Sequence, residues 1–175
     1  MRYLVIANLT LGGDALLSLL EERVAQGGAR FHVLVPATPR PAGWSSSEGA
    51  DVAAAQHRLD QALVGFRELG AEEVTGEVGT ARVVDCVGDV IRHNRDDPFD
   101  EIILSTLPAG PSRWLAMDLP SRIARAHDLP LTHVEATATD EDEQDAPQKG
   151  APHRSAPPHQ SPADVAAPTS RDQFR

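Results

Sequence analysis

The chain has 175 residues with a formal net charge of −10 and 41% hydrophobic residues, a length that suits one domain with a substantial core. Acidic residues outnumber basic ones, so the chain offers no basic surface for phosphates. The apolar runs of the chain are too short to cross a bilayer, and Cys86 is its only cysteine. We therefore expect no nucleic-acid binding, no membrane segment, no disulfide framework and no cysteine-based zinc cluster. The N-terminal residues lack a signal-peptide pattern, so we expect a cytoplasmic protein.

The first half of the chain predicts alternating strands and helices. The continuous apolar run 3–7 indicates a strand buried on both faces, and 31–35, halted by Pro36, indicates a second one. Between them the spacing predicts a helix over 14–25 with Asp14 as its N-cap. The apolar face of this helix consists of Leu16, Leu17, Leu20 and Val24.

The same alternation continues after a loop rich in Pro, Gly and Ser. The patterns predict helices over 51–69, 81–94 and 118–127 and strands over 74–78, 101–105 and 130–135. In the first of these helices the apolar face consists of Val52, Ala55, Leu59, Ala62, Leu63 and Phe66. Alternating strands and helices of this kind predict an α/β domain with a parallel open sheet and helices on both faces, Rossmann-like in architecture.

The character of the sequence changes near residue 138. Residues 139–145 are strongly acidic, and the remainder is rich in Pro, Ala, His, Gln and Ser, with almost nothing apolar to bury. We therefore expect a domain over 1–138 and a disordered acidic, proline-rich tail over 139–175. Segments of such composition are commonly disordered without a function of their own. The alternative is that the tail recruits an unknown protein partner or keeps the chain in solution.

Placed in order, several segments resemble the universal stress protein family, within the adenine-nucleotide α-hydrolase-like superfamily. The resemblance covers about 2–135 and rests on Tyr3-Leu-Val-Ile-Ala-Asn8, on Phe31-His-Val-Leu-Val35, on Glu77-Val-Gly-Thr80, on Phe99-Asp-Glu-Ile-Ile-Leu104 and on the closing run from Ser121 to Val134. It implies a five-stranded sheet of order 3-2-1-4-5. It also implies a nucleotide such as ATP or AMP as ligand, and homodimers formed through the last strand.

One departure from the family bears on nucleotide binding. Its ATP-binding members carry a glycine motif after the fourth strand, and here those positions hold Leu104, Leu107, Met117 and Asp118. Glycine allows the backbone to approach phosphates closely, whereas the Asp118 carboxylate would repel them. Asn8 replaces the usual aspartate and remains able to bond a ribose hydroxyl. The sequence therefore favours a divergent branch with weak nucleotide binding at most.

Candidate ligand-binding residues follow the first and fourth strands, because open α/β sheets bind ligands where the strand order reverses. They are Asn8, Thr10, Gly12 and Gly13 in the first loop and Ser105, Thr106, Ser112 and Arg113 in the second. The resemblance adds backbone contacts to adenine from Pro36, Val78 and Gly79. Ordinary turn chemistry also explains the two glycines, and the hydroxyls alternatively cap the loop while Arg113 pairs with Asp118.

Three functions remain open on this basis. The first is a non-enzymatic stress or regulatory protein that binds a nucleotide or small anion weakly. The second is a ligand-free homodimeric scaffold paired through the last strand, Leu131, Thr132, His133, Val134 and Glu135. The third, a nucleotide-handling enzyme, lacks support because no nucleophile elbow, phosphate loop or acid–base pair is present, and no histidine pattern indicates a metal site.

Overall fold

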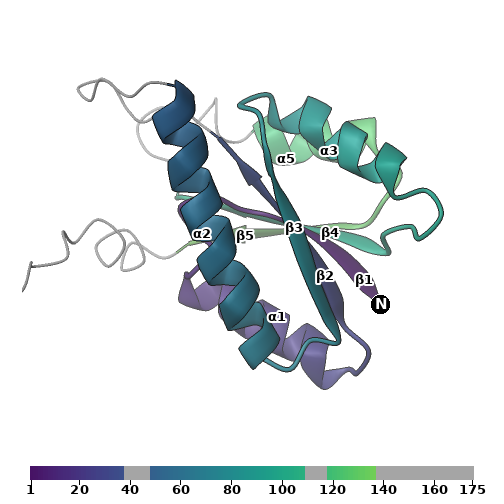
Figure 1. Ribbon diagram of the computed structural model, residues 1–175. Coiled ribbons are helices and arrows are strands. Elements are labelled where there is room, and N and C mark those ends of the chain that lie inside the picture. The colour runs from purple at the N-terminus through teal and green to yellow at the C-terminus, as the bar shows by residue number, and fades with distance from the viewer. Residues whose placement is uncertain (38–47, 109–117, 137–175) are drawn as a thin grey trace, which may run out of the picture.

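A computed structural model describes residues 1–37, 48–108 and 118–136 (Figure 1). Five strands and four helices alternate along these ranges. They are β1 (Arg2–Ile6), α1 (Asp14–Ala25), β2 (Arg30–Pro36), α2 (Glu48–Glu68), β3 (Glu73–Gly79), α3 (Val83–His93), β4 (Glu101–Thr106), α5 (Asp118–Ala126) and β5 (Leu131–Glu135). The expected elements are confirmed, with ends displaced by up to three residues.

The five strands form one parallel sheet of order β3-β2-β1-β4-β5, as expected. Strand β1 lies at its centre, with Tyr3 opposite Phe31 of β2 and opposite Glu101 of β4. From β1 the chain builds outward to β2 and β3, then returns to the other side of β1 for β4 and β5. The order therefore reverses between β1 and β4.

Helices cover both faces of the sheet (Figure 1). Side chains alternate between the faces along each strand, so Val5 and Ile103 pack with α1 and α2 whereas Leu4 and Ile102 pack with α3 and α5. The first core is closed by Leu16, Leu20, Leu59 and Phe66 and the second by Val87, Val90 and Ile123. This two-sided burial explains why the central strands read as continuous apolar runs.

Three local expectations differ from the structure. Gly13, not Asp14, is the N-cap of α1, and it has no side chain that caps the helix, so Asp14 is the first helical residue. Val52 is 43% exposed and does not join the core face of α2, because it lies in the first turns of the helix beyond the buried part of its apolar face.

The second strand includes Pro36, which was expected to end it. The amide of Ala7 donates to the Leu34 carbonyl, so the backbone groups of Leu34 and Pro36 point toward β1. At the level of Pro36, β1 has already ended. The missing N–H of Pro36 therefore removes no bond from the sheet.

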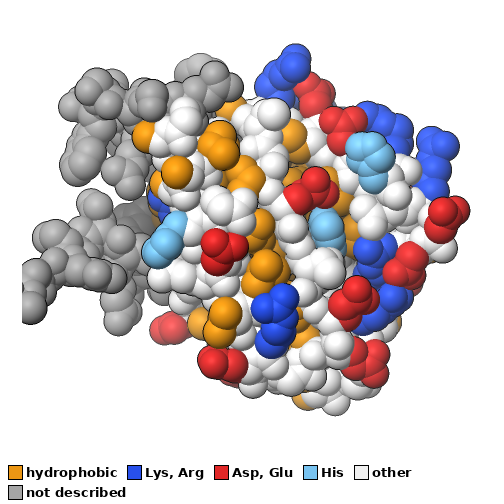
Figure 2. Space-filling view, viewed as in Figure 1, with side chains coloured by type: hydrophobic (Ala, Val, Ile, Leu, Met, Phe, Trp, Pro, Cys, Tyr) orange, Lys and Arg blue, Asp and Glu red, His pale blue; other side chains and the backbone are white. Residues whose placement is uncertain are grey.

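Charged side chains of both signs are intermixed on the side of the molecule where the N-terminus lies (Figure 2). Asp97 receives two hydrogen bonds from Arg30, of 2.8 and 2.9 Å, and lies 3.4 Å from Nε of Arg2. The Arg2 guanidinium also lies 4.4 Å above the ring of Phe99. These contacts fix the connection between α3 and β4 against the start of β1.

Candidate functional site

The carboxyl ends of β1 and β4 lie side by side at the point where the strand order reverses. Ile6 pairs with Leu104, so the segments that follow, beginning with Ala7 on one strand and Ser105 on the other, leave the sheet together. Parallel α/β sheets place ligands outside this edge. The fold therefore brings the first predicted loop and the start of the second to the same end of the sheet, the place expected for the β1/β4 crevice.

Two hydroxyl groups at this end of the sheet are buried and have no hydrogen-bond partner among the described residues. The Ser105 side chain belongs to a residue 5% exposed, the Thr10 side chain to one 2% exposed, and neither hydroxyl oxygen has a partner. Ser105 follows Ile103 by two residues, so it faces the side of the sheet covered by α1, and Thr10 lies in the turn that leads into α1. Buried hydroxyls are normally satisfied, so both mark places where a partner is missing.

Asn8 is already engaged by its neighbours. Its amide nitrogen donates to the Pro36 carbonyl at 3.0 Å, and its Oδ1 accepts a hydrogen bond of 2.9 Å from Arg58. The side chain therefore ties the end of β1 to the end of β2 and to α2. Any ligand at Asn8 competes with bonds that the protein itself makes.

Arg58 is the cation of this region that the sequence analysis missed. It projects from α2 next to the buried Leu59, half-buried, and contacts Asn8. The available signal is its position at the border of the apolar face, where a cation lies above the core and not in open solvent. Periodicity alone does not tell which strand end that border overlies.

Thr106 lies on the opposite face of the sheet from Ser105. Its hydroxyl lies 2.8 Å from Nε2 of His133 on β5, on the side covered by α5. The two adjacent hydroxyls were expected to act together, but the alternation of side chains along a strand separates them. Ser112 and Arg113 lie outside the described residues.

The positions expected to contact adenine are occupied by internal bonds. The Pro36 carbonyl accepts from Asn8, and the Gly79 carbonyl accepts from the amide of Ala37 at 2.8 Å. A Cβ on Gly79 would lie 3.0 Å from Leu34 and 3.2 Å from the sulfur of Cys86. Packing therefore accounts for glycine there, and Val78 beside it is only partly buried.

Cys86 has a local structural role. Its sulfur lies 3.1 Å from both the amide and the hydroxyl of Thr80, so it ties the start of α3 to the end of β3. The thiol is buried, as expected for a small apolar side chain.

Two positions of the expected phosphate motif, Leu104 and Asp118, carry a large and a charged side chain. Leu104 is 1% exposed in the core beneath α3 and α5, and Asp118 lies 3.9 Å from Arg122 in the first turns of α5. Gly12 is exposed and Gly13 is buried, and Gly13 has an ordinary extended backbone with φ −71°. Neither glycine needs a left-handed conformation at this turn.

Within the described ranges, no group of three or more His, Cys, Asp and Glu side chains is placed to hold a metal ion. None of the helices in those ranges combines the length and apolar character needed to span a bilayer.

Comparison with solved structures identifies the fold. A universal stress protein in complex with cAMP matches with 15% identity, 78% of this chain and 98% of the other covered, and a TM-score of 0.53. A universal stress protein family protein from Arabidopsis thaliana with AMP bound matches with 14% identity, 80% and 94% covered, and a TM-score of 0.55. A universal stress protein from Archaeoglobus fulgidus matches with 15% identity, 76% and 97% covered, and a TM-score of 0.51.

These likenesses define an open α/β protein of Rossmann-like type. More narrowly, its fold is that of the universal stress proteins. No family model matches the sequence, and no curated protein is significantly similar to it. At 12–15% identity the comparisons support the fold, and the function is argued from the site.

Proposed function

We propose that the chain is a universal-stress-type regulatory protein of the cytoplasm that binds a nucleotide or small anion weakly at the β1/β4 crevice and catalyses no reaction. The observation that carries this proposal is the pair of buried, unpartnered hydroxyls of Thr10 and Ser105 at the crevice. A ligand that accepts or donates there relieves the cost of leaving them unsatisfied. Structures of the same fold hold cAMP and AMP, which makes an adenine nucleotide the first probe.

Binding is expected to be weak for two reasons. Leu104 stands where a glycine would let the backbone approach phosphate, and the Asp118 carboxylate at the start of α5 repels phosphate. The bonds of Asn8 and Pro36 must also be disturbed or shared for a ribose or adenine to enter. The two hydroxyls are the groups left to recognise a ligand, since the Arg58 guanidinium is already bound to Asn8. This balance favours recognition over chemistry.

Thermal unfolding with and without ligand tests the proposal. With a dissociation constant of about 1 mM, 10 mM AMP stabilises the folded state by about 1.4 kcal/mol, which raises Tm by about 3–5 °C. Adenosine, which lacks the phosphate, is the matched control and should give a smaller shift. The absence of any shift with ATP, AMP and cAMP contradicts the proposal.

The ligand-free scaffold remains the second candidate. It is favoured by the internal hydrogen bonds that already satisfy Asn8, Pro36 and Gly79. A protein that binds no ligand there has no need to keep these polar groups available. Strand β5 supports it as well, because it is the last strand of the sheet and its outer edge pairs with nothing in the described chain. We propose that this edge forms a homodimer in either case.

An enzyme is the third candidate. Among the described residues, the crevice groups named above include no nucleophile hydrogen-bonded to a base, since the Ser105 and Thr10 hydroxyls have no partner at all. ATP turnover above background that is lost in Arg113→Ala would favour this candidate over the other two.

A further inference from the structure

A cavity lies at the other end of the strands from the β1/β4 crevice. It has a volume of about 380 Å³ and is lined by Ile91, Arg95, Pro98, Phe99, Ala126, His127, Asp128 and Leu129. These residues come from the end of α3, from the connection to β4 and from the connection between α5 and β5. Both connections lead into strands, so the cavity lies at the amino ends of β4 and β5. Its size falls at the lower end of small-molecule sites.

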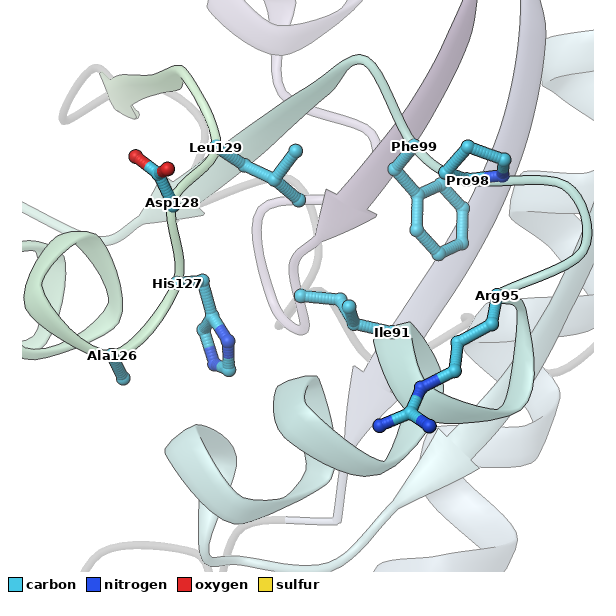
Figure 3. A pocket seen from close by; sticks show the side chains of 8 residues that line it. All are labelled: Ile91, Arg95, Pro98, Phe99, Ala126, His127, Asp128 and Leu129. Atoms are coloured by element: carbon cyan, nitrogen blue, oxygen red, sulfur yellow. The ribbon is translucent and has the colours of Figure 1, made fainter.

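The inner walls of this cavity are apolar. Figure 3 shows Ile91, Phe99 and Leu129 pointing toward a common space from three different segments. Phe99 is 4% exposed and is fixed from behind by the Arg2 guanidinium, so this wall is preformed. Such walls favour an apolar body of a few carbon atoms.

The polar groups around the cavity favour a negative charge. Arg95 forms no ion pair with any described residue, and Asp97, two residues further along, is bound by Arg2 and Arg30. The Asp128 carboxylate, the acid of the lining, points away from the shared space in Figure 3. A guanidinium without a carboxylate partner is a strong donor for one supplied by a ligand.

His127 contributes an unsatisfied polar atom to the same wall. Its Nε2 is buried and makes no hydrogen bond. The ring also donates a hydrogen bond to the Val84 backbone, so in the neutral form its other nitrogen carries the proton and Nε2 is an acceptor. Nε2 donates to a bound carboxylate only when the ring is protonated. An apolar wall, an unpaired guanidinium and an unsatisfied imidazole nitrogen therefore meet in one cavity.

We propose that this cavity binds a small organic carboxylate with an apolar body, its carboxylate on Arg95 and its body against Ile91, Phe99 and Leu129. This site is separate from the crevice and does not depend on nucleotide binding there. A small acid bound between α3 and α5 would act as a regulatory ligand of the protein.

Amide chemical-shift mapping on the 15N-labelled full chain tests the site, with benzoate as probe and benzyl alcohol as its uncharged counterpart. Benzoate is expected to bind with a dissociation constant on the order of 1 mM and to shift the amides around Ile91, Phe99 and Leu129. Arg95→Gln should weaken benzoate about five- to tenfold. Arg125→Gln, an exposed arginine on α5 outside the lining, should leave its affinity unchanged.

Ala126→Trp provides a second test that does not disturb the core, because Ala126 is exposed and lines the cavity. The larger side chain should block benzoate while the rest of the spectrum is retained. The proposal is overturned if 50 mM benzoate moves none of these amides, if benzyl alcohol binds equally well, or if Arg95→Gln and Arg125→Gln have the same effect.

Discussion

The hydroxyl of Ser105 lies at the carboxyl end of a central strand, where it is buried and has no hydrogen-bond partner in the part of the chain that the structure describes. An unsatisfied buried hydroxyl costs about 1–3 kcal/mol, and a protein of modest stability retains such a cost only with a reason. If the reason is a ligand, the Ser105 hydroxyl should not stabilise the free protein, but it should contribute to binding of the ligand.

Ser105→Ala separates these roles. The free variant should be as stable as the wild type or up to about 1 kcal/mol more stable, since it removes a desolvated group without a partner. Urea unfolding monitored by circular dichroism measures this difference. A loss of 1 kcal/mol or more would show instead that the hydroxyl stabilises the fold, and the site would lose its main support.

Asn8 and Arg58 show how far sequence reasoning extends at the scale of single residues. The position of Asn8 after a buried strand was predicted from the pattern of the chain. Its partners were not, because they lie 28 and 50 residues away in the sequence and depend on how α2 crosses the ends of the strands. Ser105 was predicted as a site residue for its place, and only the structure reveals that its hydroxyl has no partner.

Among the elements, α2 and β3 make the closest approach at a glycine. A Cβ on Gly76 would lie 2.5 Å from the Val33 carbonyl and 2.7 Å from the Leu59 side chain. From the sequence, this glycine is expected only as one residue of the strand over 74–78. Its true role is to let α2 rest directly on the sheet.

Gly76→Ala should therefore destabilise the protein by about 1–3 kcal/mol, toward the upper end because the obstructing carbonyl belongs to the neighbouring strand. Gly65→Ala is the matched control. It lies inside α2 with no atom near the new Cβ, so it should stabilise by about 0.5–1 kcal/mol. Equal effects of the two substitutions in denaturant unfolding would refute the packing argument.

The elements themselves were predictable because each has a strong periodic signal. The continuous apolar runs of β1 and β2 reflect strands that are buried on both faces. The apolar face of α3 reflects a helix that is buried on one face. The N-terminal end of α2 was harder to place, because Val52 is apolar yet exposed. The contacts of Arg2 with Asn94 and Asp97 carry no local signal, since they join segments more than 90 residues apart.

For the molecule as a whole, two histidines link stability to pH. Burial lowers the pKa of His32, only partly offset by its hydrogen bond to Glu77, and Arg2 lowers it further. Burial also lowers the pKa of His127, opposed by a backbone hydrogen bond to Val84 and reinforced by Arg92. Each histidine thus binds a proton less readily in the folded state than in the unfolded state, whose pKa is about 6.5.

Because the unfolded chain binds more protons below this pH, acidification through about 6.5 should destabilise the fold, whereas stability above pH 7 should be nearly constant with respect to these groups. Melting curves from pH 7.5 to 5.5 measure the effect. The double variant H32Q/H127Q should show a weaker dependence on pH over this window. A wild-type Tm that is the same at both ends would contradict the account.

The homodimer that we propose through β5 belongs to the scale of the whole molecule. The amide of Ala136 donates to the Thr106 carbonyl, and the amide of Ile102 donates to the Pro130 carbonyl. The backbone groups of every second residue of β5 therefore point toward β4, and the amide of His133, which lies between two such residues, points away from it. His133→Pro removes that outward donor and the side-chain contact with Thr106, but no backbone hydrogen bond to β4, and should shift the protein toward monomer. His133→Ala, which keeps the amide, should not. Sedimentation velocity at high concentration distinguishes them, and a wild type that is only monomeric would exclude this interface.

The most direct test of the central claim is the AMP-induced change in Tm, measured on the wild type and on the double variant T10V/S105A. The wild type should gain about 3–5 °C at 10 mM AMP, and the variant, folded and at least as stable when free, should gain almost nothing. An equal shift in both proteins, or none in either, would show that the buried hydroxyls at the β1/β4 crevice do not bind the ligand.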